Sequence, residues 1–287
     1  MNTLSSYKPL LIDSHCHLDR LDLSKYPDGF EGALAAAREQ GVTHFLNVSI
    51  NMESYPLIRQ MAEQHNDISI SVGVHPNETE GENPTVEQLV SEAQHPKVVA
   101  IGETGLDFFR TEGDQEWQRE RFRNHISAAK ESKKPLIIHM REATEATLQM
   151  MQQESAAEAG GVMHCFVEDW EIAQRVLDMG FHISFSGIVT FKSAKKLQEV
   201  ARKAPLESIL IETDSPYLAP MPFRGKPNEP AYLSYVAQFV ADQREMSLEA
   251  LGEATSHNFF KLFSKAVREA QIDPLETDKD HKIAGSF

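Results

Sequence analysis

Six side chains of the types that bind metal ions stand at the carboxyl ends of short apolar runs. The runs read PLLIDSHCH, KVVAIGE, KPLIIH, AGGVMH and ESILIETD. Each begins polar or beside Pro or Gly, becomes aliphatic, and finishes on an imidazole or a carboxylate. Apolar strands that present polar groups from one end predict the mouth of an active site. The six side chains are His15, His17, Glu103, His139, His164 and Asp214.

One residue, Cys16, separates His15 from His17. Alternate side chains of an extended strand point to the same face, so the two imidazoles can chelate one ion while Cys16 points away. The second cysteine of the chain, Cys165, also stands beside a histidine. With so few cysteines we expect free thiols in a reducing compartment.

Glu103 lies in AIGETGLDF, at the end of an aliphatic run and between glycines. A carboxylate buried at such a place has to be paired or bound to metal, because burying a lone charge is costly. Its two oxygens make it the natural bridge between two ions. The alternative is a helix N-cap or a surface glutamate.

His139 and His164 each end an apolar run, and two neutral imidazoles are what a second ion would need. For either residue alone, a hydrogen-bonded core histidine is the favoured interpretation, but the two together, at positions equivalent to those of the first pair and Glu103, favour metal ligation. Asp214 ends ILIETD, where it can bind the first ion and accept a proton from the attacking water. The alternative for Asp214 is the N-cap of the turn that follows.

The apolar runs alternate with amphipathic stretches, which is the pattern of βα units around a parallel sheet. FEGALAAAREQ, DQEWQRERFRNHISAAKESK and SAKKLQEVARKA are expected to be helical, as are segments near 228–242 and 247–270. We predict an α/β fold, a closed (β/α)8 TIM barrel of the metal-dependent hydrolase type, with its site at the carboxyl ends of the strands. The strands are expected near 9–13, 44–50, 68–74, 97–103, 135–139, 160–164, 181–185 and 208–213.

The 287 residues fit one such barrel, which typically needs about 250. We expect a single domain over 1–270 and a C-terminal tail over 271–287, where periodicity is lost. No signal peptide or membrane-spanning run is visible, so a cytoplasmic location without a membrane partner is expected. The net charge of −15 argues against a broad basic DNA-binding face. Cations gathered at one mouth can still attract phosphate.

Six motifs, DSHCHLD, GVHP, IGETGLDF, IIHMRE, MHCF and ETDSPYL, follow one another over about residues 13–218. Together they resemble the TatD family of metal-dependent hydrolases and deoxyribonucleases, within the amidohydrolase-like barrels. The resemblance implies two divalent metal ions, with Zn²⁺, Mn²⁺ or Mg²⁺ as candidates. It assigns the first ion to His15, His17, Glu103 and Asp214, and the second to Glu103, His139 and His164.

The family pattern often has a second histidine in the third-strand motif, where this chain reads His75-Pro76-Asn77. His75 therefore carries over as a group that binds substrate or supports a ligand, and Asn77 puts any role at its own position in doubt. Asp107 is expected to hydrogen-bond substrate or water, with a structural role as the alternative. Arginine can bind phosphate with two parallel hydrogen bonds. For Lys226 the alternative is a solvated surface lysine without a function. The cationic candidates for substrate phosphates are Arg141, Arg224 and Lys226.

The leading hypothesis is hydrolysis of phosphodiester bonds by a deoxyribonuclease, most simply the 3′-to-5′ exonuclease that the resemblance implies. Its partners would be DNA ends or a small phosphoester, and no obligate protein partner is evident. Two ions about 3.5–4 Å apart would activate a water and polarise a phosphoryl oxygen, and Asp214 would take the proton. The alternative is an amidohydrolase-type enzyme that cleaves a C–N or ester bond of a small metabolite. Glu103 favours the nuclease, because a carboxylated lysine commonly bridges the metals in that wider group. A silent barrel used as a binding scaffold is disfavoured, because every ligand position is kept.

Overall fold

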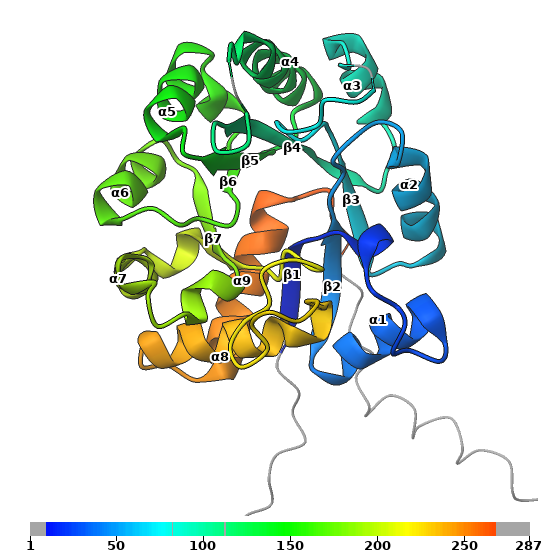
Figure 1. The fold of residues 1–287 in the computed structure, drawn as a ribbon, viewed down its shortest axis with the longest axis vertical. Helices are drawn as coiled ribbons and strands as arrows, with labels where there is room; N and C mark the ends of the chain where they lie inside the picture. The colour runs from blue at the N-terminus through cyan, green and yellow to red at the C-terminus, as the bar shows by residue number, and fades with distance from the viewer. Residues whose placement is uncertain (1–9, 82, 112, 268–287) are drawn as a thin grey trace, which may run out of the picture.

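The computed structural model describes residues 10–267, except for 82 and 112. Eight parallel strands form one sheet in the order β1 to β8, and the sheet curls into a barrel with helices around it (Figure 1). This confirms the predicted (β/α)8 barrel. The strands are β1 (Leu11–Cys16), β2 (Val42–Asn47), β3 (Ile68–Val72), β4 (Val98–Asp107), β5 (Leu136–Arg141), β6 (Gly161–Met163), β7 (His182–Phe185) and β8 (Ile209–Ile211).

Helices connect successive strands on the outside of the barrel, and two more helices follow the last strand (Figure 1). The outer helices cover the sheet with their apolar faces, as α1 does by burying Ala33, Leu34 and Ala37. The helices are α1 (Gly29–Glu39), α2 (Tyr55–Gln64), α3 (Val86–Glu92), α4 (Glu116–Ser132), α5 (Thr144–Gln153), α6 (Trp170–Asp178), α7 (Lys195–Lys203), α8 (Leu233–Gln243) and α9 (Leu248–Leu262).

The predicted elements are present, with shifts at their ends. The helix expected from 228 begins only at Leu233, because the ring of Pro230 disfavours a helical conformation at Glu229, which is extended. A 3-10 turn, Pro230–Tyr232, takes the place of its first turn. The helix expected over 247–270 ends at Leu262. The predicted tail, 271–287, lies outside the described residues.

Two separate hydrophobic cores hold the barrel together. The larger one lies between the strands and the outer helices, and it includes Leu11. The smaller one fills the inside of the barrel with residues such as Ile12 and Leu210, which alternate along the strands with outward-facing neighbours. Two fully buried rings, Phe259 of α9 and Phe263 directly after it, close this inner core.

The first and last strands are joined by side-chain and loop contacts. Thr213 donates its N–H and its hydroxyl to the carboxylate of Asp13, over 2.9 and 2.6 Å. One residue further on, the N–H of Asp214 donates to the carbonyl of His15 over 2.9 Å. These bonds fix the first-strand histidines relative to Asp214.

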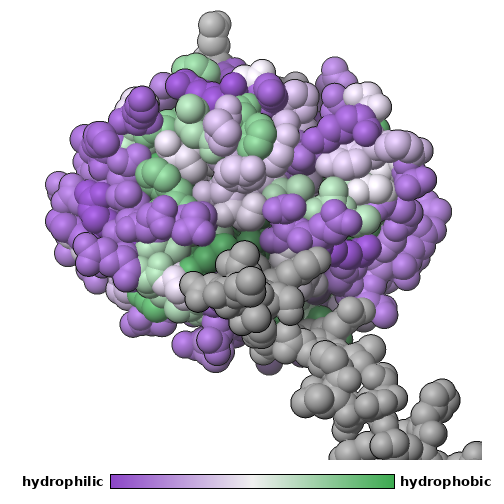
Figure 2. Space-filling model, turned by 90° about the horizontal axis from the view of Figure 1, so that it is seen from below, coloured by the Kyte–Doolittle hydropathy of each residue, from purple (hydrophilic) through white to green (hydrophobic). Residues whose placement is uncertain are grey.

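The outer surface is mainly hydrophilic on the side that Figure 2 shows, with hydrophobic patches between the polar side chains. Within the described residues, no helix combines the length and apolarity needed to cross a bilayer.

Candidate active site

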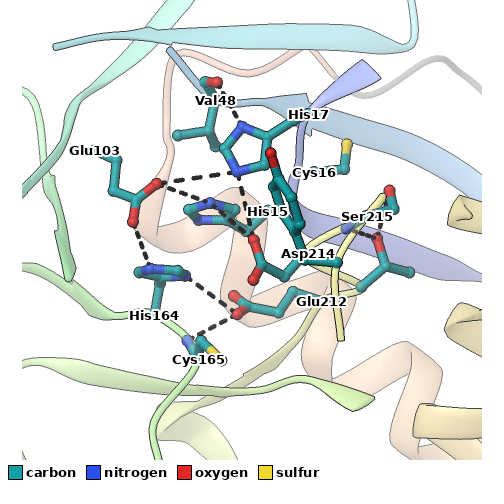
Figure 3. Close-up of polar contacts among 12 residues, drawn as sticks. His15, Cys16, His17, Val48, Glu103, His164, Cys165, Glu212, Asp214 and Ser215 are labelled. Atoms are coloured by element: carbon teal, nitrogen blue, oxygen red, sulfur yellow. Dashed lines mark hydrogen bonds and ion pairs between the residues drawn. The ribbon is translucent and has the colours of Figure 1, made fainter. Parts of the chain in front are cut away.

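The carboxyl ends of the strands bring all six predicted metal ligands into one cluster. They come from five strand ends of the barrel, and those labelled in Figure 3, all except His139, point toward one another. All but one are buried, and His139 is half-buried. His15 and His139 lie in β1 and β5, Glu103 lies in β4, and His17, His164 and Asp214 follow β1, β6 and β8.

Glu103 does not end its strand, as the sequence suggested, because β4 continues to Asp107. The register between β4 and β5 shifts after Ile101. At this point Gly102 has a φ of 142°, and a Cβ on it would lie 2.6 Å from the carbonyl oxygen of Ile137. Only glycine fits such a close approach at this φ, and the irregularity allows Glu103 to face the cluster from within the strand.

Glu103 lies between two groups of imidazoles (Figure 3). Its Oε1 is 2.9 Å from Nδ1 of His139 and 2.8 Å from Nε2 of His164. Its Oε2 faces the first-strand pair, 3.4 Å from Nε2 of His15 and 4.0 Å from Nε2 of His17. A carboxylate in this position is able to bridge two ions.

Asp214, which follows the last strand, faces the same pair of first-strand histidines. Its Oδ1 is 3.4 Å from Nε2 of His17 and 3.7 Å from Nε2 of His15. Nδ1 of His17 lies 3.1 Å from the carbonyl oxygen of Val48, which can only accept a hydrogen bond. This bond places the proton on Nδ1 and leaves the Nε2 lone pair for the cluster.

Glu212 is a buried residue of this site that the sequence analysis missed. Its Oε1 is 3.3 Å from Nδ1 of His164 and accepts the N–H of Cys165 over 2.7 Å, while its Oε2 accepts the hydroxyl of Ser184. The carboxylate therefore orients His164 with Nε2 toward Glu103. Its place two residues before Asp214, at the same strand end, was the available signal.

Asp107, expected near substrate, is held by the protein itself. Its Oδ2 is 3.1 Å from Nε2 of His139 and accepts the side-chain amide of Asn77 over 2.6 Å. The oxygen of that amide in turn accepts the hydroxyl of Thr111. Asp107 thus orients His139, and Asn77, whose role the sequence left in doubt, orients Asp107.

His75 lies on the edge of the cluster, with Nε2 3.4 Å from Oε1 of Glu103. Its Nδ1 accepts the backbone N–H of Asn77 over 3.0 Å. The neutral ring must therefore carry its proton on Nε2, where it can donate to Glu103 or to a substrate. This geometry agrees with a supporting or substrate-binding group better than with a metal ligand.

The two carboxylates among the predicted ligands, Glu103 and Asp214, are ionised at neutral pH. Burial opposes the charge on Glu103, but the imidazole of His164 and the hydrogen bond with His139 outweigh it and hold the pKa of Glu103 well below its usual value. Burial also opposes the charge on Asp214, and the hydrogen bond with His17 outweighs it, so the pKa of Asp214 is lowered.

The imidazoles divide into two groups. Burial lowers the pKa of His15, and it lowers that of His75 to about 3, so both rings are neutral. At His17, His139 and His164 burial acts in the same direction, but the neighbouring carboxylates outweigh it and raise the pKa. A metal ion would compete with these protons for the ring nitrogens.

The donor atoms fit divalent ions. Within the described residues, both ring nitrogens of His15 are buried without a hydrogen bond, which is costly unless an ion occupies one of them. Ligand atoms within 4.8 Å of one another also form three overlapping groups around Glu103 and Asp214. Mixed nitrogen and oxygen donors suit Zn²⁺ or Mn²⁺. The groups are His15, His17 and Asp214; His15, Glu103 and His164; and His75, Glu103 and His139.

The three cationic candidates are placed differently. Arg141 ends β5 beside Asp107, and its guanidinium carbon lies 3.9 Å from the ring centre of Phe109. Arg224 is exposed and stacks on Phe191, and Lys226 is exposed. In the described part of the chain no contact joins Arg224 or Lys226 to the cluster, so only Arg141 is brought near it.

Comparison with known proteins identifies the family of the chain. Residues 12–264 match the model of a family described as TatD related DNase. The chain is 42% identical over 261 residues to a metal-dependent hydrolase of Buchnera aphidicola, covering 88% of this chain and 99% of that protein. It is 43% identical over 253 residues to the metal-dependent hydrolase YcfH of Escherichia coli, covering 88% and 95%.

Solved structures show the same fold. The crystal structure of YjjV, a TatD homologue from Escherichia coli, superposes with a TM-score of 0.79 at 28% identity and covers 88% of this chain and 98% of that one. A TatD family hydrolase from Entamoeba histolytica gives a TM-score of 0.77 at 21% identity, with coverage of 90% and 99%. With the family match over most of its length, the chain belongs to the TatD family of metal-dependent hydrolases.

Proposed function

We propose that the protein hydrolyses phosphodiester bonds of DNA from the 3′ end, with two divalent ions that share Glu103. The observation that supports this most is the position of the Glu103 carboxylate, which presents one oxygen to His139 and His164 and the other to the first-strand histidines. Two ions bound there would lower the pKa of an attacking water and polarise a phosphoryl oxygen. The name of the matched family supports DNA as the substrate.

The side chains around the ions would divide the remaining work. Asp214 is ionised at neutral pH and its side chain is 12% exposed, so we place it as the group that orients the attacking water and accepts its proton. His75 can donate from Nε2 to a phosphoryl oxygen, because its Nδ1 already accepts a hydrogen bond. Arg141, the cation nearest to the cluster, would bind a phosphate of the substrate.

The charge of the chain supports action at a strand end. A net charge of −15 leaves few cations to neutralise an extended DNA backbone. Contact with a few nucleotides around the ions needs only local positive charge. We therefore expect a preference for single-stranded or frayed ends and little cleavage of closed circles.

The experiment incubates the purified protein with Mg²⁺, Mn²⁺ or Zn²⁺ and single-stranded DNA labelled at the 5′ end. Stepwise shortening of the labelled strand is expected, while covalently closed single-stranded circles stay intact. The Asp214→Asn variant is the control for a contaminating nuclease. Turnover of amides or lactones in a parallel panel, without cleavage of DNA or of a simple phosphodiester, would overturn the proposal in favour of the small-metabolite hydrolase.

A further inference from the structure

One large aromatic side chain at the rim of the site is left open to solvent. Phe109 is 53% exposed, although most large hydrophobic side chains of the described residues are buried or half-buried. The guanidinium carbon of Arg141 lies 3.9 Å from its ring centre. We call this pair the Phe109–Arg141 stack. A planar cation on an exposed ring is the arrangement that proteins use to stack nucleic-acid bases.

The stack is connected to the candidate metal cluster through Asp107. The N–H of Phe109 donates to Oδ1 of Asp107 over 3.0 Å, and Oδ2 of the same carboxylate lies 3.1 Å from Nε2 of His139. Asp107 and Arg141 are paired residues of neighbouring strands. Two short connections therefore join the exposed ring to an imidazole that faces Glu103.

The guanidinium of Arg141 has unused hydrogen-bonding capacity. Among the described residues, no carboxylate pairs with this guanidinium and no carbonyl accepts a hydrogen bond from it. Its planar group lies against the ring of Phe109. Arg175 on the outer surface differs, because its guanidinium donates two hydrogen bonds to the carboxylate of Glu145. Unpaired N–H groups beside a site that attracts phosphate are suited to a phosphate oxygen.

A second exposed aromatic ring lies on the opposite side of the cluster. Tyr217 is 49% exposed, and its ring centre lies 5.9 Å from that of His17. The cluster therefore has an open aromatic ring at its His17 side and another at its His139 side. Only the ring on the His139 side has a guanidinium stacked on it.

We propose that the Phe109–Arg141 stack is the base-binding subsite for the nucleotide whose phosphate lies at the metal cluster. The open part of the Phe109 ring stacks on the base, and the unpaired N–H groups of Arg141 bind phosphate of the same nucleotide. Every base has a π-face, so the subsite selects a nucleotide over a bare phosphodiester without reading sequence. The inference rests on the proposed nuclease function and names what that site recognises.

The test compares two oligonucleotides, one normal and one with abasic residues at its three terminal positions. Stacking on an aromatic ring is worth about 1–3 kcal/mol per base, so Phe109→Leu should raise KM on the normal strand by about five- to a hundredfold. The kcat should change less, and KM on the abasic strand should stay the same. Phe109→Tyr, which keeps the ring, is the matched conservative variant and should retain the difference in KM between the normal and the abasic strand.

A binding measurement separates this inference from the nuclease function. Strands with 2-aminopurine near the 3′ end and phosphorothioate linkages that resist cleavage are titrated with the metal-loaded protein, and quenching of the fluorescence reports stacking. Quenching should be lost in Phe109→Leu and kept in Phe109→Tyr. Arg141→Lys keeps the charge without the planar group and should weaken binding.

The outcomes are distinguishable. Equal binding by the Leu and Tyr variants, or an unchanged chain that treats normal and abasic strands alike, overturns the base subsite whatever the protein cleaves. Base-dependent quenching without cleavage of any DNA overturns the nuclease proposal and leaves the base subsite in place. Comparison of the two strands on the unchanged chain does not depend on how the Leu variant folds.

Discussion

The two ends of the barrel interior are built from opposite kinds of residue. At one end Phe259 of α9 and Phe263, the residue after it, close the inner core, and the other buried members of that core are aliphatic. At the other end buried imidazoles and carboxylates are one another's main partners. Stability needs only the first kind of end, because buried charge is costly for the fold. The second kind of end is explained by chemistry, in agreement with the usual division of labour in TIM barrels.

The largest effect is expected where Glu103 is replaced. Glu103→Gln should lower kcat by more than about a thousandfold, because bound ions supply several kcal/mol of transition-state stabilisation and the amide cannot bridge them. The variant should still unfold in one cooperative transition, measured by circular dichroism during heating. A Gln variant that keeps its activity would contradict the contrast between the two ends, because the carboxylate at the polar end would then not be needed for catalysis.

The opposite effect is expected at the apolar end. Phe259→Ala removes a fully buried ring from the inner core and should lower the free energy of unfolding by about 3–5 kcal/mol. Urea denaturation measures this loss, and kcat per folded molecule should stay near its original value at low temperature. A folded Ala variant with little activity would show that α9 acts on the chemistry as well.

A smaller effect is expected from the residue behind His164. Glu212→Gln should weaken metal binding about 10- to 100-fold, because it removes the carboxylate that orients the imidazole of His164 with Nε2 toward Glu103. Isothermal titration with Zn²⁺ measures the change. Lys203→Gln, on the outer helix α7, is the control and should bind metal as before. Unaltered affinity in Glu212→Gln would mean that His164 is oriented by other contacts.

The smallest effect is expected at His125, a structural histidine outside the cluster. His125 of α4 accepts the N–H of Val74 with Nε2 and donates from Nδ1 to Arg121, so the ring must be neutral, and burial lowers its pKa to about 4. Because this pKa lies below its ordinary value of 6.5, the neutral ring stabilises the fold above about pH 6.5, and this contribution is lost as the pH falls toward 4.

Between pH 7 and 4.5 the free energy of unfolding should therefore fall by about 2 kcal/mol more in the original chain than in His125→Gln. Urea titrations at each pH measure the difference. Metal should leave it unchanged, since His125 lies outside the cluster. Identical pH profiles for the two chains would contradict the neutral, hydrogen-bonded ring.

The sequence predicted those features that depend on local pattern. Aliphatic runs that end in His or a carboxylate located the strands and the six clustered side chains, because a parallel barrel brings all such ends to one face. The supporting contacts depend on pairs far apart in the chain, such as Glu212 with His164 and Asn77 with Asp107. No spacing rule reveals these pairs.

The same limit applies to the extra length of β4 and to the substrate cations. The irregularity of β4 at Gly102 depends on a close approach to Ile137 on the next strand, so a periodicity argument ended the strand at Glu103. Arg141 and Arg224 were equivalent candidates by residue type. Pairing of β4 with β5 distinguishes them, because it places Arg141 beside Asp107 and leaves Arg224 without a contact to the cluster in the described residues.

The central claim is that one end of the barrel holds two ions that share Glu103. The most direct measurement is anomalous X-ray scattering from crystals soaked with saturating Zn²⁺ or Mn²⁺, with elemental analysis of the same protein in solution. The account predicts two ions per chain, one beside His15, His17 and Asp214, the other beside His139 and His164, with Glu103 between them. A single ion at saturating metal, or two ions that do not share Glu103, would contradict it.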